Sequence, residues 1–413
     1  MKKNLAISLF ALALVISLIG CTTARPEVTE ETDTARPAQV VSEPQADQTA
    51  AHTYFKAQDL VDQIRIGWNL GNTLDAHRHG DLSIRDLSVE ELEVLWGYNA
   101  FGVTTKENIN AIKNAGFNII RIPVTWYKVI DDNYTIRADW MARVKEIVDY
   151  AAANDMFIIL NTHHDEYIFK VMDNGMEETK VAFRKIWEQI AYTFRNYNEK
   201  LIFEGLNEPR TLGSANEWGG GTEEERKNLN ILNQLFVDVV RESGGNNARR
   251  ILMIPTYAAS AAEVAQRDLV IPTDKANTEN KLIVSIHMYA PWEFAGDKGD
   301  GQRSTWSADN PNDTNPIIHG LGLMYEIFVS QGIPVIIGEF GNLNRDNLGY
   351  RVAWTEFYVT EAEKRGIPVV WWDNGRIAIT RTQDDPDNFG IIDRNDNTFP
   401  FPGIIEAMLK ATE

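Results

Sequence analysis

The sequence predicts an α/β fold, the TIM (β/α)8 barrel, for residues 54–413. Short apolar runs alternate along this stretch with longer segments of helical period, as in chains that alternate β-strands with α-helices. There are eight such runs, and a barrel of this type has eight parallel strands. Polar side chains stand at most run ends, where these barrels carry their functional groups. We therefore expect one large catalytic domain.

Each predicted strand is a nearly continuous apolar run. Such runs are typical of strands buried between the interior of a barrel and its outer layer of helices. In chain order, the runs cover residues 64–70, 118–122, 156–162, 201–206, 250–255, 282–287, 334–338 and 368–372.

The segments between these runs include five that predict helices, because each has an apolar stripe of helical period. Two of them end next to a glycine, Gly116 or Gly366, and glycine is the usual residue for the left-handed turn after a helix. The predicted helices cover residues 106–114, 139–153, 181–197, 225–242 and 350–364.

Residues 1–20 resemble a bacterial secretion signal. Lys2 and Lys3 precede an apolar stretch, and Leu18-Ile19-Gly20-Cys21 looks like the lipobox of a lipoprotein. This resemblance implies cleavage before Cys21 and a lipid on its thiol, so the only cysteine of the chain is an anchor. The alternative is a chance match.

Residues 21–53, which begin with the lipidated cysteine, predict a disordered linker. They mix Pro, Thr, Ala, Gln and acidic residues and contain almost no aromatic side chains. We expect an exported lipoprotein that is held at the outer membrane or cell surface through Cys21. Thr22 is not the aspartate associated with retention at the inner membrane.

The formal net charge of −19 argues against two classes of partner. Nucleic acids and anionic lipid headgroups need clustered Lys and Arg, which this acidic chain does not favour. We therefore expect a neutral partner and no nucleic acid. No linear signal reports the oligomeric state, and we expect a monomer.

Six of the eight predicted strand ends carry polar or aromatic residues suited to chemistry. Any one of them is also compatible with a turn or a solvated strand end. Their coincidence at the end of the barrel where active sites lie indicates a functional site. The residues are Arg121, His163-His164-Asp165, Asn207-Glu208, His287 with Tyr289, Glu339, and Trp372-Asp373-Asn374.

Glu208 and Glu339 are the two carboxylates that suit cleavage of a glycosidic bond. One would protonate the leaving oxygen while the other attacks the anomeric carbon. Carboxyl groups about 5 Å apart give retention of configuration and a wider gap gives inversion, which the sequence does not decide. We expect Arg121 to hold Glu339 ionised and the charge of Glu339 to raise the pKa of Glu208. Asn207 is placed to bind the 2-hydroxyl of the sugar.

The pair His163-His164 raises the alternative of a metal site. Neighbouring residues of a strand point to opposite faces, and the helical i, i+4 spacing of two metal-binding histidines is absent. We therefore expect these histidines to contact sugar or carboxylate groups, and we predict no metal and no cofactor.

Tryptophan is frequent, with eleven residues in the chain. Trp372, at the end of the last predicted strand, is the clearest site candidate. Four others fall in predicted loops, where they either stack on sugar rings or pack at the rim of the barrel. They are Trp126, Trp218, Trp292 and Trp306.

Seven sequence blocks resemble glycoside hydrolase family 5, and within it the bacterial endoglucanases, over about residues 54–410. The blocks are GWNLGNTLDA at 67–76, RIPVTW at 121–126, LNTHHDE at 160–166, LNEPR at 206–210, HMYAPWEF at 287–294, GEFG at 338–341 and WWDNG at 371–375. The resemblance implies a TIM barrel that cleaves β-linked glucans with retention and without a cofactor.

This resemblance also implies roles for individual residues. The glutamate of the Asn-Glu-Pro block implies Glu208 as acid/base, and that of the Gly-Glu-Phe block implies Glu339 as nucleophile. The other matching active-site positions are Arg121, His163, Asn207, His287, Tyr289 and Trp372. We also expect Asn72 and His164 to bind substrate or support the site.

The preferred polysaccharide remains open at this point. Related enzymes often have Trp-Gly-Asn-Pro in an early loop, where this chain has Trp96-Gly97-Tyr98-Asn99. The leading interpretation is an endo-β-1,4-glucanase that acts on β-glucan. The alternatives are a xyloglucanase, mixed-linkage glucanase or mannanase on the same scaffold, and a surface glycan-binding lipoprotein without catalytic activity.

Overall fold

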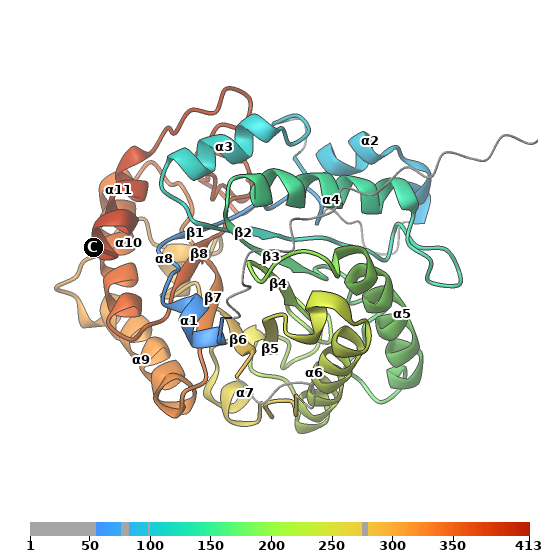
Figure 1. Cartoon of the computed structure of the whole chain (residues 1–413). Helices are drawn as coiled ribbons and strands as arrows, with labels where there is room; N and C mark the ends of the chain where they lie inside the picture. The colour runs from blue at the N-terminus through green and yellow to red at the C-terminus, as the bar shows by residue number, and fades with distance from the viewer. Residues whose placement is uncertain (1–54, 76–81, 98–99, 275–279) are drawn as a thin grey trace, which may run out of the picture. The chain divides into compact units, whose positions relative to one another are not determined.

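The computed structural model describes residues 55–75, 82–97, 100–274 and 280–413. Eight parallel strands close into a barrel in chain order, and helices surround them (Figure 1). The predicted TIM barrel is therefore confirmed. The strands are β1 (Gly67–Asn69), β2 (Ile119–Ile122), β3 (Phe157–Asn161), β4 (Leu201–Glu204), β5 (Leu252–Ser260), β6 (Leu282–His287), β7 (Val335–Phe340) and β8 (Val369–Trp371).

All eight strands lie within or overlap the predicted apolar runs. The main difference is β5, which continues to Ser260 instead of ending at Pro255. Its pairing with β6 shifts register between these two residues, and Ala258 and Ala259 adopt positive φ. A bulge of this kind does not interrupt the apolar composition, so the sequence pattern did not reveal it.

Helices form the outer layer of the barrel (Figure 1). Within the described residues the α-helices are α1 (Ala57–Val61), α2 (Val89–Val94), α3 (Lys106–Asn114), α4 (Ala138–Ala153), α5 (Met176–Phe194), α6 (Glu223–Glu242), α7 (Glu263–Arg267), α8 (Trp292–Ala295), α9 (Pro311–Ile327), α10 (Leu348–Glu363) and α11 (Pro402–Ala411). Short 3₁₀ turns cover Leu82–Asp86, Gly245–Ala248 and Val329–Gln331.

The five predicted helices are present as α3, α4, α5, α6 and α10, with shifts at their ends. Gly116 and Gly366 have positive φ, as expected after α3 and α10. The sequence prediction omitted α9. Pro311 and Pro316 resemble helix breakers, but Pro311 occupies the first turn, where its missing N–H is not needed, and the Asn310 side chain caps it.

The side chains that point into the barrel are apolar at one end and polar at the other. On β2, β3, β4 and β6, inward-facing isoleucines belong to one buried cluster, and each is followed two residues later by an inward-facing polar residue. Ala57, Leu60 and Val61 of α1 belong to the same apolar cluster and close that end of the barrel. The polar end is the C-terminal end of the strands, where the predicted site lies.

Residues 1–54 lie outside the described residues, and so do the predicted signal peptide, Cys21 and the linker, which remain predictions. Tyr98 and Asn99 of the divergent loop also lie outside. In the part of the chain that the structure covers, none of the helices has the length and apolarity needed to span a membrane.

Candidate active site

The C-terminal end of the barrel brings the two predicted carboxylates together. Glu339 belongs to β7, and Glu208 lies in the turn after β4. Three atoms lie within 4.8 Å of one another: one carboxylate oxygen of Glu208, one of Glu339, and a ring nitrogen of His287. Carboxyl groups separated by about 5 Å are typical of retaining glycosidases, whereas inverting enzymes leave a wider gap for water. The approach of these two oxygens favours the retaining arrangement over the inverting one.

Glu339 is held at both carboxylate oxygens. Arg121 Nη1 donates to Oε1 at 2.7 Å, and the Tyr289 hydroxyl donates to Oε2 at 2.9 Å. The salt bridge expected between Arg121 and Glu339 is present. Burial and the negative charges of Glu339 and Glu208 raise the pKa of Tyr289 well above its usual range, so its hydroxyl stays protonated and remains a donor.

Glu208 lies among cationic groups. His287 Nδ1 is 2.8 Å from Glu208 Oε1, and Arg210 Nη1 is 3.5 Å from the other oxygen. Burial raises the pKa of Glu208, but its interactions with His287, Arg210 and His164 outweigh burial and lower that pKa below its usual range.

The expectation that Glu339 keeps a proton on Glu208 is therefore wrong. It considered only the second carboxylate, whereas the cationic neighbours dominate the field at Glu208.

Arg121 is fully buried and connects four side chains. Its Nε donates to Glu204 at 2.8 Å, Nη2 to Asn207 Oδ1 at 2.6 Å, and Nη1 to Asn69 as well as Glu339. Burial lowers the pKa of Arg121, but Glu204 and Glu339 outweigh it and raise that pKa above its usual value. Arg121 therefore stays charged, and it fixes Asn207 beside Glu339.

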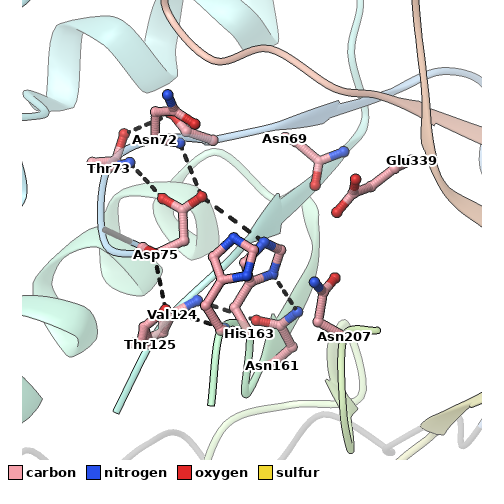
Figure 2. Close-up of polar contacts among 12 residues, drawn as sticks. Asn69, Asn72, Thr73, Asp75, Val124, Thr125, Asn161, His163, Asn207 and Glu339 are labelled. Carbon is pink, nitrogen blue, oxygen red and sulfur yellow. Dashed lines mark hydrogen bonds and ion pairs between the residues drawn. The ribbon is translucent and has the colours of Figure 1, made fainter. Parts of the chain in front are cut away.

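His163 and His164 lie on the same side of the site. Their rings meet edge to face with centroids 4.4 Å apart. Figure 2 shows Asp75 beside His163, and one ligand atom from each of Asp75, His163 and His164 lies within 4.8 Å of the others. The expectation that these histidines point to opposite faces is wrong, because β3 ends at Asn161 and strand alternation no longer applies.

The hydrogen bonds of His163 do not suit a metal ligand. Asn161 Oδ1 accepts from Val124 N at 3.1 Å, so the amide nitrogen of Asn161 faces His163 Nδ1 at 3.2 Å (Figure 2). In a neutral ring Nδ1 must accept, and the proton lies on Nε2, the atom that faces Asp75 at 3.9 Å. Metal-binding histidines instead donate from their second nitrogen. The cluster therefore favours a sugar hydroxyl over a cation.

A cavity of about 350 Å³ lies beside this cluster, and Asn72, His164 and Trp372 line it together with Trp96. The ring of Trp372 stacks on that of His163, with 5.8 Å between centroids and 4° between planes. A larger cavity, of about 870 Å³, lies beside α10, and neither Glu208 nor Glu339 lines either cavity. Cavity size alone therefore does not locate the chemistry.

The family model of cellulase, glycosyl hydrolase family 5, matches residues 79–377. The chain belongs to this family. Endoglucanase A of Clostridium longisporum is 40% identical over 86% of the chain, and the chain spans 65% of that relative's length.

Two solved structures are similar to this family 5 chain over nearly their whole length. The GH5-4 broad specificity endoglucanase from Ruminococcus champanellensis, with bound cellotriose, is 40% identical with a TM-score of 0.81, covering 87% of this chain and 99% of that one. A xyloglucan-specific endo-β-1,4-glucanase from a metagenomic library, in complex with cellotriose, is 38% identical with a TM-score of 0.76, covering 85% and 98%.

The four loop tryptophans of this family 5 chain fall into two groups. Trp126 and Trp306 are buried, so stacking on a sugar ring is excluded for these two, and Trp126 Nε1 donates to Asn161 O. Trp218 and Trp292 are 59% and 57% exposed. The Arg210 guanidinium lies 4.5 Å from the Trp218 ring, which places that tryptophan beside a neighbour of Glu208.

Sequence reasoning missed a layer of buried polar residues directly below the predicted site. A signal was present in the alternation of the strands, because a polar residue two positions after an inward isoleucine also points inward. These residues are Asn161 after Ile159, Glu204 after Ile202 and Ser285 after Ile283, and Asn69 joins them from β1.

Proposed function

We propose that the protein is a retaining endo-β-1,4-glucanase that hydrolyses internal bonds of β-glucans by double displacement. The observation that carries this proposal is the approach of Glu208 and Glu339 to within 4.8 Å at the mouth of a family 5 barrel. Membership of the family and similarity to endoglucanases support the substrate class.

In the first step Glu339 attacks the anomeric carbon and forms a glycosyl-enzyme ester as the bond to the leaving oxygen breaks. Arg121 and Tyr289 hold both oxygens of Glu339, which fixes the carboxylate in one orientation. Water then attacks the ester from the side that the leaving group vacated, and Glu339 is released. Two inversions at one carbon give net retention.

Glu208 supplies the proton for the leaving oxygen, and His287 Nδ1, 2.8 Å from Glu208 Oε1, holds this carboxyl group in place. When a sugar displaces water, a charged Glu208 is less well solvated, which favours the protonated form that acts as the acid. Glu208 then protonates the leaving oxygen. In the second step Glu208 takes a proton from the attacking water, which restores its protonated form.

Asn207 and Trp372 would position the sugar. Asn207 Oδ1 accepts from Arg121, so its amide N–H groups are the end that meets a sugar hydroxyl, and the 2-hydroxyl is our assignment. Trp372 forms a wall of the cavity beside His163 and supplies an aromatic face for the apolar side of a pyranose ring.

The preferred polysaccharide is a finer proposal. Similarity to both a broad specificity and a xyloglucan-specific enzyme favours a glucan backbone, with mixed-linkage glucan and xyloglucan as the alternatives to cellulose. Mannan is the least supported alternative. A purely glycan-binding role does not require the close pairing of Glu208 and Glu339.

The experiment compares residues 54–413 with the Glu339→Gln variant on carboxymethyl-cellulose, mixed-linkage glucan, xyloglucan and mannan, following viscosity and reducing ends together. We expect viscosity to fall quickly for few new ends with the unmodified protein and not with the variant. Equal activity in both would refute the role of Glu339, and glycan binding without product would favour the non-catalytic alternative.

We also propose that the protein is exported as a monomeric lipoprotein, anchored through Cys21 at the outer membrane or cell surface. The lipobox-like run before Cys21 supports the anchor, and a site completed by residues of one chain supports the monomer. Mass spectrometry of the full chain and of Cys21→Ser should find lipid only on the former, and light scattering should give the mass of one chain.

A further inference from the structure

Glu204 is a fully buried carboxylate that the proposed reaction does not use directly. It points into the barrel from the end of β4, two residues after the apolar Ile202. Burying an unpaired carboxylate is costly, so the partners of Glu204 indicate what holds it there. Arg121 Nε and Asn161 Nδ2 donate to Oε2 at 2.8 and 2.9 Å, and the Ser285 hydroxyl donates to Oε1 at 2.5 Å.

The contact with Arg121 sets the direction of the guanidinium. This group is planar, so a fixed Nε leaves few orientations for the two terminal nitrogens. With Nε on Glu204, Nη1 reaches Glu339 and Nη2 reaches Asn207. The position of Glu204 therefore determines how Arg121 presents the proposed nucleophile and the amide of Asn207.

The contact with Asn161 extends to His163. Val124 N–H fixes the oxygen end of the Asn161 amide, so the nitrogen end donates both to Glu204 and to His163 Nδ1. Figure 2 shows Asn161 between Val124 and His163. This chain of contacts keeps Nδ1 of His163 as an acceptor and its proton on Nε2, on the side of Asp75.

We propose that Glu204 is a positioning residue for the cleavage reaction, acting through Arg121 on Glu339 and through Asn161 on His163. This inference rests on the proposed function. The buried centre holds one guanidinium and two carboxylates, Arg121 with Glu204 and Glu339, so its formal charge is −1. Glu204 thus shares the positive charge that would otherwise act on Glu339 alone.

A buried ion pair that only stabilises the barrel would have different consequences. Removing the charge of Glu204 eliminates a like charge that shares Arg121 with Glu339, so the acid limb of the activity should move to lower pH. The charged and titratable groups that face Glu339 are otherwise unchanged: Arg121, Tyr289, His287 and Glu208. A purely structural role would lower stability or the amount of active enzyme without moving the pH profile.

The test compares Glu204→Gln with Ser285→Ala, a matched control that removes one hydrogen bond from Glu204 and keeps its charge. In Glu204→Gln the amide oxygen can still accept from Arg121 and Asn161. The readouts are melting temperature and kcat and KM for 2,4-dinitrophenyl β-cellobioside between pH 3 and pH 9, because this leaving group needs little acid catalysis.

For Glu204→Gln we expect kcat to fall at least about 10-fold with a smaller change in KM, since misplacing a reacting group costs rate. The acid limb of kcat/KM should move to lower pH by about half a unit or more. Ser285→Ala should keep the limb of the unmodified protein. The inference would be overturned if an active Glu204→Gln variant kept the acid limb of the unmodified protein. It would also be overturned if the acid limb moved equally in Glu204→Gln and Ser285→Ala.

A second measurement does not depend on whether a variant folds. ¹⁵N NMR of the unmodified protein at pH 7, with the His163 signal assigned through His163→Asn, should show Nδ1 unprotonated and Nε2 protonated. A proton on Nδ1 would overturn the path through Asn161. An unmodified protein that cleaves no glucan or aryl cellobioside would instead refute the proposed function and, with it, this inference.

Discussion

Replacing Tyr289 with phenylalanine should move the acid limb of activity to higher pH. The change removes the hydroxyl that donates to Glu339 Oε2 at 2.9 Å and leaves the ring in place. A hydrogen bond to a charged group contributes about 1.5 to 3 kcal/mol. At 1.36 kcal/mol per pH unit, its loss corresponds to a shift of about one to two units.

The sign of this shift follows from which form of Glu339 the hydroxyl stabilises. Tyr289 is a donor throughout, because burial and the two carboxylates raise its pKa well above the usual range. Its hydrogen bond favours the carboxylate form of the nucleophile, so loss of the hydroxyl should move the acid limb of the activity to higher pH. Glu204→Gln should move the same acid limb to lower pH. The two variants therefore change the surroundings of Glu339 in opposite senses, and their shifts should have opposite signs.

The assay is kcat/KM for 2,4-dinitrophenyl β-cellobioside against pH, which reports the essential groups of the free enzyme. Tyr358→Phe is a matched control, because Tyr358 is also buried but donates to Met288 O. Its limb should coincide with that of the unmodified protein. A limb that stays in place or moves to lower pH in Tyr289→Phe would refute the reasoning.

Three further predictions concern other parts of the site. Glu208→Ala should lose about 10² to 10⁴-fold on polymer and far less on the dinitrophenyl substrate, which needs little acid help, and equal losses would reject the acid role. Burial raises the pKa of Asp165 to about 7, so the folded state binds its proton more tightly than the unfolded chain does. The contribution of Asp165 to the free energy of unfolding should therefore fall by at most about 1.36 kcal/mol per pH unit between pH 4 and pH 7. In urea unfolding, the free energy of Asp165→Asn should depend less on pH than that of the unmodified protein. Trp372→Ala removes an aromatic wall of the cavity and should lower kcat/KM on cello-oligosaccharides about 10-fold or more, whereas an unchanged value would exclude stacking there.

The barrel was predictable because its signals are local. The apolar runs that became β3 and β6 needed only hydrophobicity and length, and Gly116 and Gly366 ended helices through their own backbone freedom. α9 was not among the predicted helices, although Pro311 is compatible with the first turn of a helix, where its missing N–H is not needed.

The site was predictable in its members but not in its contacts. The rule that active sites lie at the C-terminal ends of barrel strands was enough to select Glu208 and Glu339, and no interatomic distance was needed. The pKa of Glu208 depends on His287 and Arg210, which approach from elsewhere in the sequence, so the expected direction was wrong. Glu204 was overlooked because it lies inside the predicted run 201–206, and its three donors come from other strands.

The stereochemistry of the first product tests the central claim most directly. The account predicts retention, because Glu208 and Glu339 are too close to admit a water between them and the substrate. ¹H NMR of cellohexaose hydrolysis, recorded before mutarotation, should show the β-anomer of the new reducing end appearing first. An α-anomer formed first would mean inversion, and it would contradict the assignment of Glu339 as the nucleophile.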